Sequence, residues 1–223
     1  MQDFDYGREM LKWLAIITMT VDHMGAVLYQ DLQVLRWIGR LAFPLFAYLL
    51  VLGIENTRNV RNYFVRLFVF ALVSQVPFFL AIDYAPFELL NIFFTLASGL
   101  LFIHFFKNGS AIAFVVLLFS FVLPFDYGVY GIAIIGCMYI LRMNTKFGVV
   151  SLVLLNALFL APLNSQILSL VVIPFILLHK NGSLTITRDT TGDQRIPLWR
   201  KYFFYAYYPL PLVLLYAIKL TVS

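Results

Sequence analysis

The chain is a succession of apolar runs separated by short polar breaks or by breaks that contain proline and glycine. Nine runs can be drawn, at 12–29, 36–54, 63–83, 88–106, 111–124, 129–142, 147–160, 165–178 and 201–220. A helix needs about 20 apolar residues to cross a bilayer, so the first four runs and the last predict membrane-spanning helices. The four runs between 111 and 178 have only about 14 residues each, which leaves open whether two of them merge or turn back within the membrane.

The composition agrees with this pattern. Hydrophobic residues make up 62% of the chain and charged residues 12%, and the mean hydropathy is +0.88. Soluble domains carry roughly 25% charged residues. We therefore predict a polytopic membrane protein, an all-α helical bundle with about nine transmembrane helices in a single domain over 1–223. The long polar segment at 179–200 is predicted to be a cytoplasmic loop or cap.

The basic residues are distributed unevenly between the two sides that nine alternating crossings define. Of the 16 Lys and Arg residues, 13 fall on the side of the N-terminus, and only Arg36, Arg40 and Lys219 fall on the other. Basic loops stay in the cytoplasm, so we predict a bacterial inner-membrane protein with its N-terminus inside and its C-terminus outside. The basic residues are too sparsely interleaved with aromatic ones to indicate nucleic-acid binding. No CxxC pair or nucleotide fingerprint occurs, and no metal is expected.

Polar residues inside the apolar runs are the candidate functional residues. The stretch "ITMTVDHMGAVLY" (17–29) carries Asp22 and His23 within a predicted span. A charge at the centre of the membrane costs on the order of 3 kcal/mol. A rise of about 1.5 Å per residue places a set of polar residues in the same outer half. This set comprises Asp22, His23, Arg40, Gln75, Asn91 and Thr95, with Asp126, Tyr127 and Tyr130 at the outer mouth. The pattern predicts one polar cavity that opens outward.

Within this cavity His23 has the most versatile chemistry, as general acid, general base or nucleophile. Asp22 is predicted to pair with Arg40, and Arg40 could instead bind an anionic group or a developing oxyanion. Neighbouring residues on a helix diverge by about 100°, so only one of Asp22 and His23 is expected to face the cavity. A structural role stays open for each of the three residues. His23 could simply bond a backbone carbonyl, and Asp22 and Arg40 could form an ion pair that only holds the helices together.

Other charged residues and prolines have simpler interpretations. His104 and His179 are predicted to be structural. Arg58, Arg61 and Arg66 are expected to anchor lipid headgroups or to attract the phosphates of an anionic cosubstrate. Pro44 and Pro77 predict kinks in the second and third runs near the polar layer. Pro209 and Pro211 lie inside the last run, where the lost helix bonds must be replaced by protein or water and so imply a cavity.

Six motifs in fixed order point to a known family: "LKWLAIITMTVDHMG" (11–25), "LRWIGRLAFPLFAYLLVLG" (35–53), "NTRNVRNYFVRLFVFALVSQVPF" (56–78), "LNIFFTLASGL" (90–100), "DYGVYG" (126–131) and "KYFFYAYYPLPL" (201–212). The sequence resembles the TraX family, whose namesake acetylates the N-terminus of conjugative pilin subunits. This family is one of the multi-pass membrane acyltransferases. One position departs from the family: Pro211 stands where the last span usually carries a histidine, while Tyr208 is kept. The loss removes one candidate base.

The resemblance implies an acetyltransferase that uses acetyl-CoA and gives His23 and Arg40 central roles. His23 would act as general base or as transient acetyl carrier, and Arg40 would stabilise the oxyanion. The expected binding residues for the donor phosphates are Arg58, Arg61, Arg66 and Lys201. Those for the acceptor are Gln75, Asn91, Thr95, Asp126, Tyr127, Tyr130 and Tyr208.

The acceptor is expected to be a pilin-like N-terminus, a peptide or a glycan that enters from the outer side. Two other functions stay open, because a cavity with Asp, His and Arg also suits a proton-coupled transporter. The third possibility is a non-catalytic membrane assembly factor.

Overall fold

The computed structural model describes residues 5–159, 164–183 and 198–222. Its elements are α1 (Tyr6–Val27), α2 (Gln33–Gly39), α3 (Ala42–Asn56), α4 (Val60–Ile82), α5 (Ile92–Lys107), α6 (Ile112–Val122), α7 (Gly128–Met143), α8 (Thr145–Leu158), the 3₁₀ helix η1 (Asn164–Val172), α9 (Ile173–Lys180), α10 (Leu198–Ala206) and α11 (Pro209–Val222). Within these residues the only β-type pairing is an isolated bridge between Leu90 and Phe125. The all-α prediction is confirmed for this part of the chain.

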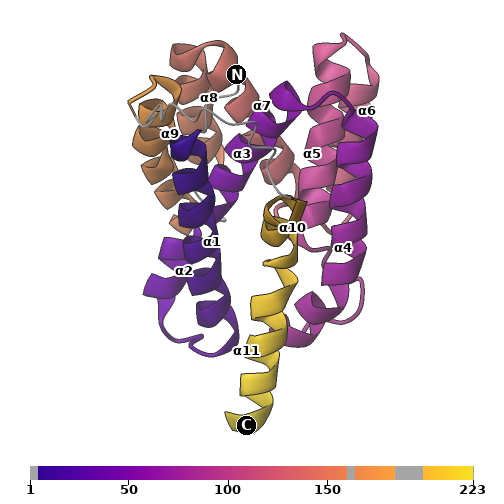
Figure 1. The fold of residues 1–223 in the computed structure, drawn as a ribbon, viewed down its shortest axis with the longest axis vertical. Helices are drawn as coiled ribbons and strands as arrows, with labels where there is room; N and C mark the ends of the chain where they lie inside the picture. The colour runs from indigo at the N-terminus through magenta and orange to yellow at the C-terminus, as the bar shows by residue number, and fades with distance from the viewer. Residues whose placement is uncertain (1–4, 160–163, 184–197, 223) are drawn as a thin grey trace.

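The helices run up and down along one axis (Figure 1). Helix α1 starts at the end of the bundle opposite the one where α11 finishes, and each predicted apolar run overlaps a helical segment. Three helical stretches are long and apolar enough to cross a membrane, at 33–56, 60–82 and 202–221. The other apolar helices are shorter, and the predicted loop at 179–200 lies largely outside the described residues. A helical membrane protein is thus supported, while the number of crossings and the orientation stay predictions.

Three of the predicted runs are broken into two helical pieces, and each break has a proline just after it. Pro44 lies in the first turn of α3, Pro174 near the start of α9, and Pro209 is the first residue of α11. Proline lacks an N–H and cannot donate to the carbonyl four residues earlier, so a continuous helix ends ahead of it. Pro77, by contrast, is accommodated inside α4, which runs unbroken to Ile82.

Helix α3 is the central element of the bundle, with most of its side chains buried on every side. Helix α4 lies at the periphery of the bundle. One of its faces is buried against other helices and the opposite face is exposed. Its buried positions recur at the three- and four-residue spacing of one helix face; they are Leu67, Ala71, Ser74, Gln75, Phe78 and Ala81. Its other face exposes apolar residues, as expected for a surface that contacts lipid.

A chain of polar contacts joins several helices at the end of the bundle where α1 begins. The buried Tyr48 hydroxyl lies 3.0 Å from His179 Nδ1, and His179 Nε2 lies 3.1 Å from an Asp5 carboxylate oxygen. Burial opposes ionisation of Asp5, but the backbone N–H of Arg8 and the His179 side chain outweigh it, so the pKa of Asp5 is lowered. These contacts tie α1, α3 and α9 together and agree with a structural role for His179.

Candidate functional site

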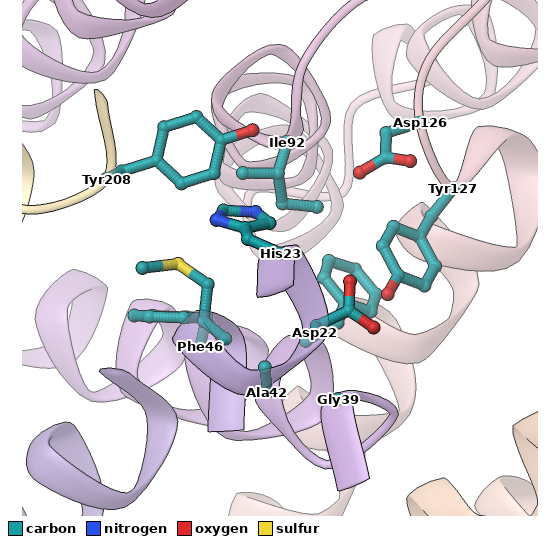
Figure 2. A pocket seen from close by; sticks show the side chains of 11 residues that line it. Asp22, His23, Gly39, Ala42, Phe46, Ile92, Asp126, Tyr127 and Tyr208 are labelled. Carbon is teal, nitrogen blue, oxygen red and sulfur yellow. The ribbon is translucent and has the colours of Figure 1, made fainter. Parts of the chain in front are cut away.

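A cavity of about 40 Å³ lies near the end of the bundle where α1 finishes, large enough for a few water molecules. It is lined from α1, α2, α3, the start of α5, the segment before α7 and the joint between α10 and α11. The lining residues are Met19, Asp22, His23, Gly39, Ala42, Phe43, Phe46, Ile92, Asp126, Tyr127 and Tyr208. Figure 2 shows the His23 ring beside Tyr208 and Ile92, with Asp22, Asp126 and Tyr127 gathered on the other side of the same space.

His23 is 6% exposed, and its Nδ1 is buried with no hydrogen-bond partner among the described residues. Its ring meets the Tyr208 ring edge-on, with centroids 5.5 Å apart. Tyr208 is itself buried, and its ring also meets Phe93 edge-on, with centroids 5.1 Å apart. Buried polar atoms normally have a partner, so an unpartnered ring nitrogen beside a cavity is typical of a group that bonds a ligand.

Asp22 is held by Arg36 rather than by Arg40. Arg36 Nη1 lies 2.5 Å from Asp22 Oδ2 and 3.2 Å from the Asp22 carbonyl oxygen. The predicted pair between Asp22 and Arg40 is therefore wrong. Arg36 and Arg40 lie about one helical turn apart in the sequence. The short helix α2 packs against α1 and so places Arg36, the earlier of the two, beside Asp22.

Gly39 permits this approach. A Cβ atom at this position would overlap the Asp22 carboxyl group, so α2 can pack this closely on α1 only with glycine here.

Asp22 and His23 both line the cavity. The prediction that only one of them would face it is wrong, because both side chains border the same space. Asp22 faces the end of α2, and His23 faces the joint between α10 and α11, so the angle of about 100° between them places them on two walls of one space.

Arg40 lies outside the cavity lining, at the break between α2 and α3. Its Nε donates to Ser165 Oγ at 3.1 Å. Ser165 belongs to η1, whose buried residues recur every third position, as a 3₁₀ helix requires; they are Gln166, Ser169 and Val172. The expected role of Arg40 at an oxyanion stays a prediction, without a contact to His23 that supports it.

Gln75 and Asn91 also lie outside the cavity, and they satisfy each other. The Asn91 side-chain amide donates to Gln75 Oε1 at 2.8 Å and to the Ala71 carbonyl at 2.7 Å, while Asn91 Oδ1 caps α5 by accepting from Phe93 N. Gln75 donates in turn to the Leu89 carbonyl. These two residues, predicted as cavity walls, instead fix the start of α5 against α4.

The residues predicted at the outer mouth divide into two groups. Asp126 and Tyr127 line the cavity, and the Tyr127 ring stacks on Phe43 with centroids 4.1 Å apart. The Tyr130 hydroxyl instead donates to Asn156 Oδ1 at 3.1 Å. Thr95 is fully buried, and its hydroxyl has no partner among the described residues.

The four residues predicted to bind donor phosphates lie elsewhere. Arg58 and Arg61 are exposed near the start of α4, and Arg66 is partly buried one turn further along. The Arg66 guanidinium lies 5.3 Å from the Tyr63 ring centroid. The Lys201 side chain lies outside the described residues. No described residues form a group of three or more His, Cys, Asp or Glu side chains that could hold a metal.

Sequence reasoning missed Arg36, Gly39 and Phe43 as parts of the site. The motif "LRWIGRLAF" contained all three, and its glycine one position before Arg40 was a usable signal of close helix approach. Which of Arg36 and Arg40 pairs with Asp22 could not be predicted without knowing where the chain breaks between α2 and α3.

The fold and the site define a helical membrane protein with a small, partly polar cavity around a histidine. The chain belongs to the TraX family: it matches the family described as TraX protein over residues 7–219.

Two curated relatives are similar over part of the chain. "Probable fimbrial assembly protein FimC, serogroup H1" of Dichelobacter nodosus is 35% identical over 114 residues, which covers 45% of this chain and 46% of that protein. "Uncharacterized protein RP591" of Rickettsia prowazekii (strain Madrid E) is 29% identical over 102 residues, which covers 46% of this chain and 38% of that protein. The chain thus spans less than half the length of either relative. No solved structure matches it.

Proposed function

We propose that this protein is a membrane-embedded acetyltransferase that moves an acetyl group from cytoplasmic acetyl-CoA to an amine or hydroxyl at the outer half of the membrane. The observation that carries the proposal is His23: a buried imidazole with an unpartnered Nδ1 that lines a cavity inside the bundle. Membership of the TraX family supports the reaction class. The name of the Dichelobacter relative supports a pilus-related role for this chain.

In this mechanism His23 acts as general base. The acceptor nitrogen or oxygen attacks the thioester carbonyl carbon, a new C–N or C–O bond forms, and the C–S bond breaks. His23 takes the proton of the acceptor and returns it to the departing thiolate of CoA. The buried Tyr208, whose ring meets His23 edge-on, supplies a hydroxyl on the cavity wall that can stabilise the oxyanion. For an acceptor that arrives as an ammonium ion, Asp126 on the cavity wall takes the extra proton, so that the neutral amine attacks and His23 handles the second proton.

The reaction needs more space than the cavity offers. Ligand sites usually enclose about 300–1,000 Å³, whereas this cavity has about 40 Å³. The C-terminal wall has less packing to lose than the wall from α2 and α3, because only 17% of the apolar window in 202–221 is buried, against 61% in 33–56. The proposed mechanism therefore places substrate entry at a movement of α10 and α11 away from His23.

The proposed orientation puts the N-terminus in the cytoplasm and the cavity in the outer half of a bacterial inner membrane. Its support is the excess of basic residues on the N-terminal side and the position of His23 near the far end of α1. The acceptor is then a pilin-like N-terminus, a peptide or a glycan presented from outside.

The test uses purified protein in liposomes, radiolabelled acetyl-CoA and peptides with a free or a blocked N-terminus. We expect labelled peptide with wild type, loss of at least 100-fold in rate for His23→Ala, and no loss for His104→Ala, a matched histidine in α5. Absence of transfer by wild type would refute the proposal. Proton-coupled uptake without CoA would favour the transporter, and a copurifying partner with no effect of His23→Ala would favour the assembly factor.

A further inference from the structure

The cavity beside His23 has a polar side and an apolar side. The polar side is formed by Asp22, Asp126 and Tyr127, and Figure 2 shows Phe46 across the His23 ring from these three residues. A ligand that fills the whole cavity is therefore polar at one end and apolar at the other. Several of the apolar lining residues come from three helices; they are Met19 from α1, Ala42 and Phe46 from α3, and Ile92 from α5.

Two of these residues, Met19 and Phe46, close one end of the cavity. On α1, Met19 lies about one turn before His23, and on α3, Phe46 lies about one turn after Ala42. Because α1 and α3 run in opposite directions (Figure 1), Met19 and Phe46 both lie toward the end of the bundle where α1 begins. Met19 is 6% exposed, and Phe46 is half-buried and packs against the same hydrophobic core. We call these two residues the Met19–Phe46 end.

An opening at α10 and α11 leaves the Met19–Phe46 end in place. The segment 33–56, which contains Phe46, has 61% of its apolar window buried, whereas the segment 202–221 has only 17% buried. Close-packed interiors resist displacement, so the wall from α1 and α3 keeps its shape when the C-terminal wall moves. The arm of a donor enters through the opening, but its acyl group still meets the unchanged end beside His23.

We propose that Met19 and Phe46 limit the transferred acyl group to acetyl, an inference that rests on the proposed function. The cavity of about 40 Å³ holds roughly three water-sized groups, which matches the carbonyl carbon, the carbonyl oxygen and the methyl group of an acetyl group. A longer chain would place its added methylene against Met19 or Phe46, and overpacking of a close-packed wall is unfavourable. The bonds made and broken are those of the acetyl transfer above, since only the length of the acyl chain differs.

The experiment compares acetyl-, propionyl- and butyryl-CoA in two assays: calorimetric binding to protein in nanodiscs without acceptor, and transfer to a peptide. The variants are Met19→Ala, Phe46→Ala and Phe46→Leu, with Phe102→Ala as the matched control, a half-buried phenylalanine of α5 outside the cavity lining. We expect wild type to prefer acetyl-CoA over propionyl-CoA by about tenfold or more, the usual effect of one methylene in an apolar pocket.

The alanine variants should bind and use propionyl-CoA better than wild type does, because each removes part of the Met19–Phe46 end. Their preference for acetyl-CoA should fall to about threefold or less, and Phe46→Leu should lie between wild type and Phe46→Ala. A variant that fails to fold cannot gain activity with a longer chain, so this gain separates a wider pocket from a damaged protein.

The two assays separate this inference from the proposed function. Equal use of acetyl- and propionyl-CoA by wild type, or a preference that changes no more in the alanine variants than in Phe102→Ala, would overturn the role of Met19 and Phe46 while leaving the acetyltransferase standing. A binding preference for acetyl-CoA that is relaxed in Phe46→Ala, without transfer of any acyl group by wild type, would uphold the role of these two residues and refute the proposed acetyltransferase. Absence of both binding and transfer would overturn both.

Discussion

Replacement of Arg36 by Gln is predicted to destabilise the protein by about 2 kcal/mol. Unit charges about 4 Å apart attract by about 4 kcal/mol at an effective dielectric constant near 20. The Arg36 and Asp22 side chains are 34% and 20% exposed, so water screens part of this attraction. The expected cost lies between the 0.2–1 kcal/mol measured for exposed pairs and the roughly 3–5 kcal/mol of a broken buried pair. In a chain of this length it lowers the melting temperature by about 4–8 °C.

The assay is thermal unfolding in detergent of wild type, Arg36→Gln, Asp22→Asn and the double variant. The double variant should be more stable than the sum of the single losses predicts, because neither charge is left alone in the cavity. The matched control is Arg40→Gln, whose side chain bonds Ser165 instead. A coupling energy below about 0.5 kcal/mol, or a larger coupling of Asp22 to Arg40 than to Arg36, would refute the assignment of the pair.

Three further predictions follow from other contacts, each measured by thermal unfolding. Gly39→Ala should cost about 1–3 kcal/mol, because the added methyl group overlaps Asp22. Tyr48→Phe should cost about 1–3 kcal/mol, because it leaves the buried His179 Nδ1 without its partner. Asn91→Ala should cost about 2–4 kcal/mol, since it removes both the cap of α5 and the bonds to α4.

Each of these predictions has a matched control. Gly136→Ala adds a methyl group 3.1 Å from Phe102 Cε1, a contact that a small shift relieves, and should leave stability near wild type. Tyr84→Phe changes an exposed tyrosine, and Asn108→Ala changes an asparagine just after α5 whose side chain makes no hydrogen bond within the part of the chain that the structure describes. Equal losses in a variant and in its control would contradict the contact invoked.

The helical segments could be predicted from the sequence because membrane helices show long apolar runs that few other structures share. All nine runs overlap helical segments in order. The internal breaks were harder, since a proline indicates a disruption but leaves open whether it produces a break or a tolerated kink. Pro77 is tolerated inside α4, whereas Pro174 follows a 3₁₀ segment.

The site was predictable at α1 and less so elsewhere. Asp22, His23, Asp126 and Tyr127 do meet around one cavity, as depth along the helices suggested, and Tyr208, expected from the family resemblance, joins them. Gln75 and Asn91 lie at a similar depth, but depth does not specify the direction in which a side chain points around its helix. Their mutual hydrogen bonds, and the choice of Arg36 over Arg40, depend on helix rotation and on a break that only the packing determines.

The central claim is that the His23 imidazole performs chemistry rather than holding the fold. The most direct measurement is acetyl transfer by purified His23→Gly with and without added imidazole, beside His104→Gly. We predict that His23→Gly is folded and nearly inactive, that imidazole restores activity by entering the space left beside Tyr208, and that His104→Gly is unaffected. Wild-type transfer by His23→Gly in the absence of imidazole would contradict the account.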